Sequence, residues 1–177
     1  LVAISGGKDS AVLLERIHEN LGKRRDVTIV GGCVDEGIEG YRPPSLECAR
    51  ELCEELGIRF ETVSYPELGF KEMDEVVDKI VQLEERKAPC SYCGVFRRQG
   101  INHLANRVNA DVIALGHNLD DMAQTIMMNM QNGDLERTLR LAPHTSTPLE
   151  GMAPRIVPLR WIPEQEIHLY ALHKKLP

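Results

Sequence analysis

The chain is 177 residues long, 42% of them hydrophobic and 27% charged, with a formal net charge of −6. These values are ordinary for one folded domain, and the negative charge argues against a large basic face for binding nucleic acid. No apolar run reaches the length of a membrane span and no secretory signal is visible, so we expect no membrane partner. Five cysteines without such a signal argue against a disulfide framework and favour a reducing, cytoplasmic location.

Apolar runs alternate with amphipathic segments along the chain, and this alternation predicts the secondary structure. We expect strands over residues 1–4, 27–34, 58–63, 111–115 and 155–158. We expect helices that begin after residue 10, cover 44–56, 70–83, 92–108 and 120–130, and begin again at residue 163. Turn residues, charges and prolines over 132–152 predict a mobile loop. Strands that alternate with helices predict an α/β domain with a doubly wound parallel sheet, in which a ligand lies beyond the carboxyl ends of the strands.

A glycine turn separates the first strand from the first helix. Its residues are Ser5, Gly6, Gly7, Lys8, Asp9 and Ser10. Glycines let the backbone approach a ligand, the free N–H groups of a helix start attract phosphate, and a lysine adds a compact cation. The spacing differs from the Walker pattern. The hexapeptide instead resembles the PP-loop of the N-type ATP pyrophosphatases, which implies that these residues bind the pyrophosphate part of ATP.

Cys90 and Cys93 are three residues apart near the predicted start of a helix, a spacing that suits metal binding or sulfur chemistry. A structural zinc site needs about four ligands, and the sequence has no second pair with this spacing. A thioredoxin-like redox pair would follow a first strand, which this pair does not. An iron–sulfur cluster would need one more thiolate, from Cys33 or from outside the chain, and an incidental pair is the fourth interpretation. Arg97 would lie on nearly the same helix face as Cys93, where it could stabilise a thiolate, a cluster or a phosphate.

Two more groups of polar residues follow predicted strands. Gly116 and His117 lead into Asp120 and Asp121, adjacent carboxylates at a helix start that suit Mg²⁺ binding or N-capping. Capping would account for one of them but not for both together with His117, which could hydrogen-bond a nucleotide or move a proton. Asp35 follows the second strand, where an acidic residue can contact a ribose or a base. We expect these residues to meet the glycine turn in one crevice.

These motifs together resemble the TtuA and cytosolic thiouridylase family over nearly the whole chain. The resemblance is carried by residues 5–10, 34–38, 41–42, 90–98, 116–121, 158–160 and 163–164. It implies a PP-loop ATP pyrophosphatase domain of the adenine nucleotide alpha hydrolase-like fold over residues 1–177, and ATP-dependent replacement of oxygen by sulfur at C2 of a tRNA uridine. ATP with Mg²⁺ would adenylate the uridine, and sulfur held at a [4Fe-4S] cluster would displace AMP. Cys90 and Cys93 would then bind the cluster, while Arg97 and Asp120 or Asp121 would be catalytic.

The family pattern has parts that this sequence lacks. Members carry terminal zinc-binding segments and a third cluster cysteine downstream, and we expect these parts to lie outside the printed sequence. The resemblance also implies a homodimer, and either a ubiquitin-like carrier or free sulfide as the sulfur donor. Lysidine synthetases are related PP-loop enzymes that need no cysteine pair, and TtcA-type cytidine thiolases carry a second pair. A non-catalytic nucleotide-sensing module on the same scaffold is the alternative from a different class.

Overall fold

The computed structural model describes residues 1–82, 88–139, 141 and 151–177. Its strands form one parallel sheet in the order β3-β2-β1-β4-β5, with β1 (Val2–Ala3), β2 (Val30–Asp35), β3 (Arg59–Ser64), β4 (Ile113–Ala114) and β5 (Arg155–Ile156). The chain runs outward from β1 to β3 and then continues on the other side of β1, so the strand order reverses between β1 and β4. The doubly wound parallel sheet predicted from the sequence is confirmed, and its switch point lies where such sheets bind ligands.

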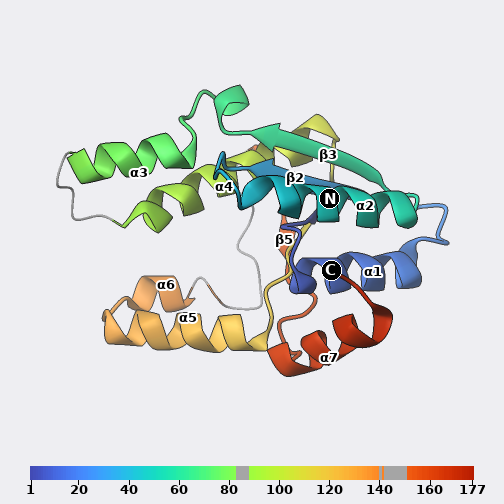
Figure 1. The fold of residues 1–177 in the computed structure, drawn as a ribbon. Coiled ribbons are helices and arrows are strands. Elements are labelled where there is room, and N and C mark those ends of the chain that lie inside the picture. The colour runs from blue at the N-terminus through green and yellow to red at the C-terminus, as the bar shows by residue number, and fades with distance from the viewer. Residues whose placement is uncertain (83–87, 140, 142–150) are drawn as a thin grey trace.

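Helices cover both faces of the sheet (Figure 1). One face carries α1 (Lys8–Leu21), α2 (Arg42–Glu55) and α7 (Glu164–Lys174), and the other carries α3 (Met73–Gln82) and α4 (Pro89–Arg107). Each layer has its own apolar core. Val2 and Ile4 pack with α1, α2 and α7, whereas Val34 and Val63 pack with α4 and Met73. Strands that are buried on both faces read as largely apolar runs, which is why strands are recognisable at residues 1–4 and 30–34. The predicted start of the second strand, residue 27, lies three residues before the observed start of β2 at Val30.

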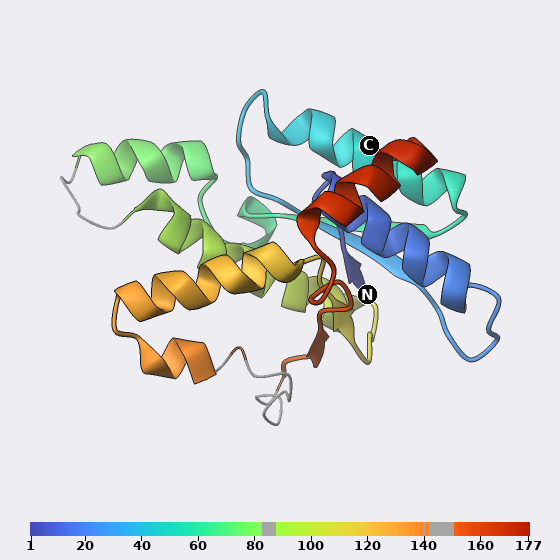
Figure 2. The same cartoon turned by 90° about the horizontal axis from the view of Figure 1, so that it is seen from below.

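Two helices extend away from the sheet. α5 (Leu119–Gln131) follows β4 and packs against the short α6 (Leu135–Leu139), both orange in Figure 2. A short 3-10 helix, η1 (Pro66–Leu68), follows β3. None of the helices in the described ranges combines the length and the apolar character that crossing a membrane requires.

The element boundaries differ from the prediction in several places. α1 begins at Lys8 and α4 at Pro89, each three residues earlier than predicted, because a glycine can precede a helix and a proline suits its first turn. β4 has two residues instead of five. The stretch 132–152 is predicted as a loop but contains α6; its residues 140 and 142–150 lie outside the described ranges.

Candidate functional site

Residues 5–10, here called the glycine loop, connect the carboxyl end of β1 to the first turn of α1. Gly7 is the N-cap of α1 and has extended backbone angles, and no side chain caps the helix there. Gly6 has a φ of +86°, and a Cβ at this position would lie 2.1 Å from the carbonyl oxygen of Ser45. The glycine loop therefore packs tightly on α2 while the first N–H groups of α1 lack a side-chain acceptor, which is the arrangement that binds anions.

The two serines of the glycine loop hold its shape. The Ser10 hydroxyl donates to the Gly7 carbonyl oxygen at 2.8 Å and accepts from the Ser5 backbone N–H at 3.1 Å. The two hydroxyl oxygens are 3.1 Å apart. Ser5 and Ser10 are thus structural in the described state, and a contact of either hydroxyl with phosphate stays a prediction.

Lys8 supplies a cation at the glycine loop. Its Nζ lies 2.7 Å from Glu164 Oε1, at the start of α7, and 3.3 Å from Asp9 Oδ2. The hydrogen bond with Glu164 raises the pKa of the Lys8 ammonium, so this side chain is charged at neutral pH. An anion bound at the glycine loop would compete with Glu164 for Lys8.

The end of β4 meets the glycine loop at the switch point, as predicted. A Cβ on Gly116 would lie 3.3 Å from Ser10 Cα, and Asn118 Nδ2 donates to Asp9 Oδ1 at 3.2 Å. His117 is exposed between these two residues. Close packing of the two loops thus depends on a residue at position 116 without a side chain.

Both acidic residues at the start of α5 bind backbone N–H groups. Asp121 Oδ2 accepts from the Asn118 N–H at 3.0 Å while Asn118 Oδ1 accepts from the Asp121 N–H at 2.9 Å, which forms a capping box. Asp120 Oδ2 accepts from the Glu164 N–H at 2.7 Å, at the first turn of α7. Backbone N–H groups at the starts of two different helices therefore account for both carboxylates, although the sequence offered capping for only one of them, and these contacts do not involve His117. Their roles with Mg²⁺ or in catalysis stay predictions.

The acidic residue buried at the end of β2 is Glu36, not Asp35. Asp35 Oδ1 accepts from the Gly37 N–H at 3.0 Å, which turns the chain after the strand. Glu36 is only 2% exposed and lies between two guanidinium groups. Its Oε2 is 2.7 Å from Arg42 Nε, as an ion contact without hydrogen-bond alignment, and its Oε1 accepts from Arg97 Nε at 2.8 Å.

Arg42 extends this contact to the glycine loop. The side chain is 4% exposed at the start of α2. Its Nη1 donates to the Ser5 carbonyl oxygen at 3.1 Å, and its Nη2 contacts Cys33 Sγ at 2.9 Å and the Val34 carbonyl oxygen. A guanidinium has donors for all of these acceptors at once, and it stays charged when buried.

Arg97 extends the contact to the cysteine pair. Cys90 is exposed and Cys93 is half-buried, and both lie in the first turns of α4. Cys93 Sγ is 3.6 Å from Arg97 Nη2 and 3.4 Å from the Tyr65 hydroxyl, which also donates to the Cys93 carbonyl oxygen at 3.1 Å. Burial raises the pKa of the Tyr65 hydroxyl, so this group stays protonated. An unbroken chain of polar contacts therefore joins the glycine loop to Cys93.

The described residues supply only part of a metal-binding site. Cys90 and Cys93 offer two thiols, but within the described ranges no three His, Cys, Asp or Glu residues are grouped to hold a metal. Cys33 does not serve as the third ligand, since it is 0% exposed and contacts Arg42 of α2, on the face opposite α4. Burial raises the pKa of its thiol to about 11. The described residues therefore do not complete the ligand set of an iron–sulfur cluster.

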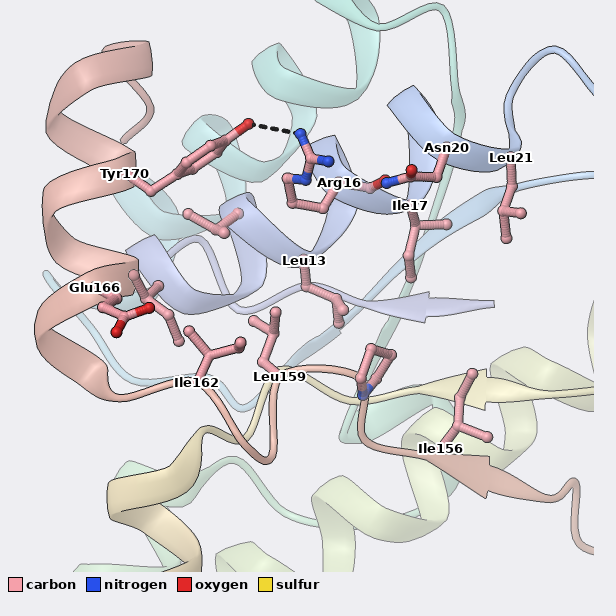
Figure 3. Close-up of a pocket in the computed structure, with 13 residues that line it drawn as sticks. Leu13, Arg16, Ile17, Asn20, Leu21, Ile156, Leu159, Ile162, Glu166 and Tyr170 are labelled. Carbon is pink, nitrogen blue, oxygen red and sulfur yellow. Dashed lines mark hydrogen bonds between the residues drawn. The ribbon is translucent and has the colours of Figure 1, made fainter.

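A pocket of about 570 Å³ lies away from these groups (Figure 3). It is formed mainly by apolar side chains of α1, α7 and the segment before α7, including Leu13, Ile17 and Leu159. Arg16 donates to the Tyr170 hydroxyl at 3.1 Å on its rim. The pocket is on the apolar side of α1, whereas the glycine loop is at the N-terminus of that helix, so the two are separate features.

Sequence reasoning missed Glu36, Arg42 and Tyr65. Asp35 and Glu36 are adjacent acids, and the sequence does not show which of them turns inward. Glu36 and Arg42 are six residues apart just after a buried strand, and this spacing was the only pattern in the sequence that could have suggested a buried ion pair. Tyr65 follows a predicted strand, and nothing in the sequence around it indicates a contact with Cys93.

Comparison with known proteins identifies the family of this chain. The model of the PP-loop domain family matches residues 1–177. The tRNA 2-thiolation protein NcsA of Haloferax volcanii is 40% identical over 183 residues, covering 100% of this chain and 56% of that protein. The cytoplasmic tRNA 2-thiolation protein 1 of Danio rerio is 41% identical over 178 residues, covering 99% of this chain and 50% of that protein. The chain thus spans about half the length of the curated relatives it matches.

Solved structures of other proteins have a similar fold. The U34-tRNA thiolase NcsA from Methanococcus maripaludis, with its [4Fe-4S] cluster, is 37% identical with a TM-score of 0.85, covering 99% of this chain and 55% of that one. An NH3-dependent NAD synthetase from Campylobacter jejuni is 16% identical with a TM-score of 0.58, covering 99% and 63%. The second likeness concerns the fold alone.

Proposed function

The chain belongs to the PP-loop domain family, and from this premise we propose that it is the ATP-binding core of a tRNA 2-thiolation enzyme acting on the wobble uridine. The observation that carries the proposal is the chain of contacts from the glycine loop through Arg42, Glu36 and Arg97 to Cys93. A site that only sensed nucleotides would not need a thiol connected to its phosphate-binding loop through a series of polar contacts. The wobble position is favoured over the T-loop because a relative named as a U34-tRNA thiolase covers 99% of this chain.

The proposed reaction has two steps. The uridine O2 attacks the α-phosphorus of ATP, and the bond to pyrophosphate breaks. Sulfur at the oxidation level of sulfide then adds to C2, and AMP leaves with the original oxygen, so no net oxidation or reduction takes place. The first step converts a poor leaving group into a good one.

The residues of the glycine loop would bind the triphosphate. The first N–H groups of α1 and the Lys8 ammonium are donors that stabilise charge on the phosphate oxygens as the bond to pyrophosphate breaks. Asp120 and Asp121 each use one carboxylate oxygen for a helix cap, and we propose them as the residues that hold Mg²⁺, which would supply further charge stabilisation. Asp35, Gly116 and His117 would contact the nucleoside part of ATP.

At the other end of the site, Cys90 and Cys93 would supply two ligands of a [4Fe-4S] cluster, whose chemistry is to bind sulfur for transfer. A third ligand would come from outside the described residues, and we propose that it lies, with zinc-binding segments, in further parts of the protein. Arg97 would place positive charge beside Cys93, where the incoming sulfur and the departing AMP are both anionic.

Several finer points complete the proposal. We place the enzyme in the cytoplasm because relatives carry that word in their names. A homodimer, a ubiquitin-like carrier or free sulfide as sulfur donor, and membership of the TtuA and cytosolic thiouridylase family follow from the sequence resemblance alone.

The test uses the full-length protein, purified without oxygen. Cys93→Ser should lower 2-thiouridine formation by about 100-fold or more, because loss of even a group that supports a metal ligand costs about 10–100-fold, while ATP affinity stays within about twofold. Cys48→Ser, a half-buried cysteine on α2, is the matched control and should leave both unchanged. AMP, pyrophosphate and modified tRNA are measured by mass spectrometry. Release of phosphate instead of pyrophosphate, or full activity of Cys93→Ser, would contradict the proposal.

A further inference from the structure

We propose that Glu36 is a positioning residue that holds the glycine loop and Arg97 in one fixed arrangement, an inference that rests on the proposed function. Glu36 follows β2, while its two partners belong to helices on opposite faces of the sheet. Arg42 begins α2, and Arg97 lies on α4 (Figure 1). One carboxylate at the end of a central strand thereby connects the two helical layers at the edge where the ligand would lie.

The burial of Glu36 makes the arrangement rigid. The Glu36 side chain is 3% exposed and the Arg42 side chain is 5% exposed, so neither group can exchange its partner for water. Each carboxylate oxygen faces a different guanidinium, Oε2 toward Arg42 and Oε1 toward Arg97. A carboxylate accepts in both directions, whereas a glutamine would turn an NH₂ donor toward one of two donors. Only an acid of this length meets both contacts.

The far ends of the two arginines are the groups that the proposed reaction uses. Arg42 Nη1 fixes the Ser5 carbonyl oxygen, directly before Gly6, and so fixes where the glycine loop begins. Arg97 Nη2 lies 3.6 Å from Cys93 Sγ. A shift of Glu36 would therefore disturb the phosphate-binding end and the sulfur end together.

The three charged groups Glu36, Arg42 and Arg97 carry a net positive charge. Glu36 balances one of the two guanidinium charges, which leaves one positive charge in excess. Arg42 is enclosed, but Arg97 has a side chain that is 59% exposed and can meet a ligand. The excess charge is thus available at Arg97, where an anionic sulfur donor or the phosphate of AMP would arrive.

A double-mutant cycle separates positioning from ordinary structural support. The variants are Glu36→Gln, Arg97→Gln and the double variant, with Glu39→Gln as the matched control, since Glu39 is an exposed acid in the same loop. Full-length protein is assayed for ATP affinity by calorimetry, for the turnover rate of tRNA thiolation, and for thermal stability. Effects of residues that act as one unit do not multiply, whereas independent effects do.

We expect Arg97→Gln to lower the turnover rate by about tenfold or more while ATP affinity stays within about twofold. Glu36→Gln should lower the turnover rate similarly and also weaken ATP binding, and the double variant should be no slower than Arg97→Gln by more than about twofold. A product of the two single effects on the turnover rate, or the same losses in Glu39→Gln, would overturn the proposal.

Two further measurements keep the test decisive. If Glu36→Gln does not fold, Glu36→Asp takes its place in the cycle, because it keeps the charge but is too short to keep both contacts. If the wild-type protein makes no 2-thiouridine, the proposed function fails, but ATP binding still tests the Glu36–Arg42 connection. In that case weaker ATP binding by Glu36→Asp supports the connection, and unchanged binding refutes it.

Discussion

The ion pair between Lys8 and Glu164 should weaken ATP binding, and Glu164→Gln should therefore strengthen it. Lys8 Nζ lies 2.7 Å from Glu164 Oε1, and the side chains are 30% and 50% exposed. Bound phosphate would need the same ammonium hydrogens, so ATP must first displace the glutamate. The glutamine introduced at position 164 keeps the size of the side chain but removes its charge.

The magnitude follows from the exposure of the pair. Exposed ion pairs contribute about 0.2–1 kcal/mol, because water and salt screen them. Removing the competitor should therefore lower the ATP Kd by up to about fivefold, with a larger effect at low ionic strength. Lys8→Gln should act in the opposite direction, weakening binding by about 10-fold or more through loss of a charged hydrogen bond.

Calorimetric titration of ATP at two salt concentrations measures these effects. Glu166→Gln is the control, since Glu166 is another exposed acid in the first turn of α7. If Glu164→Gln binds ATP as weakly as the wild type at low salt, the competition does not exist. If Glu166→Gln gains as much affinity, the cause is the overall charge of the helix and not the contact with Lys8.

Two further predictions concern the glycine loop and the buried thiols. Gly6→Ala should weaken ATP binding by more than about tenfold in a titration. The alanine Cβ would clash with the Ser45 carbonyl oxygen, and the left-handed backbone would cost about 1–2 kcal/mol in addition. Gly40→Ala is the control for the backbone cost alone, because Gly40 has a φ of +73° and open space around it. Burial raises the pKa of both Cys33 and Cys53 to about 11. The folded state therefore favours the protonated thiols, and the contribution of each thiol to the free energy of unfolding is fully present below the pKa of the unfolded thiols, near 9. As pH rises toward about 11, the free energy of unfolding should fall by roughly 2–3 kcal/mol per thiol. Denaturant unfolding between pH 8 and 11 measures this loss, and an equal alkaline slope in Cys53→Ala would contradict it.

The sequence predicted the fold because the inner strands β1, β2 and β4 are largely buried and turn residues follow them directly. The glycine loop, the end of β2 and the end of β4 meet as the topology requires, since parallel strands present their carboxyl ends at one edge. Helix starts were predicted late where the first turn is not apolar. Lys8 begins α1 and Pro89 begins α4, and neither belongs to the apolar stripe of its helix.

Side-chain partnerships were harder to predict than positions. Glu36 and Arg97 are 61 residues apart in the sequence, and their contact depends on how α4 crosses the end of β2. Asp120 and Glu164 are similarly distant, so the sequence could not show that Asp120 caps α7. A local pattern indicated that either Asp120 or Asp121 caps a helix, but it did not show that the capping box joins Asn118 and Asp121.

Glu164 and Glu36 both pair with cations in the candidate site, but separating the pair costs much less for Glu164 than for Glu36. Glu164 is exposed, so when phosphate displaces it from Lys8, water solvates the freed charge at little cost. Glu36 is buried, and an uncompensated charge there would cost about 3–5 kcal/mol, so it keeps Arg42 throughout. The Lys8 ammonium can therefore exchange partners as a nucleotide arrives and leaves, while the Glu36–Arg42 contact keeps the backbone of the glycine loop in place. A loop that binds and releases phosphate needs both properties, because its cation must change partners while its backbone donors stay aligned.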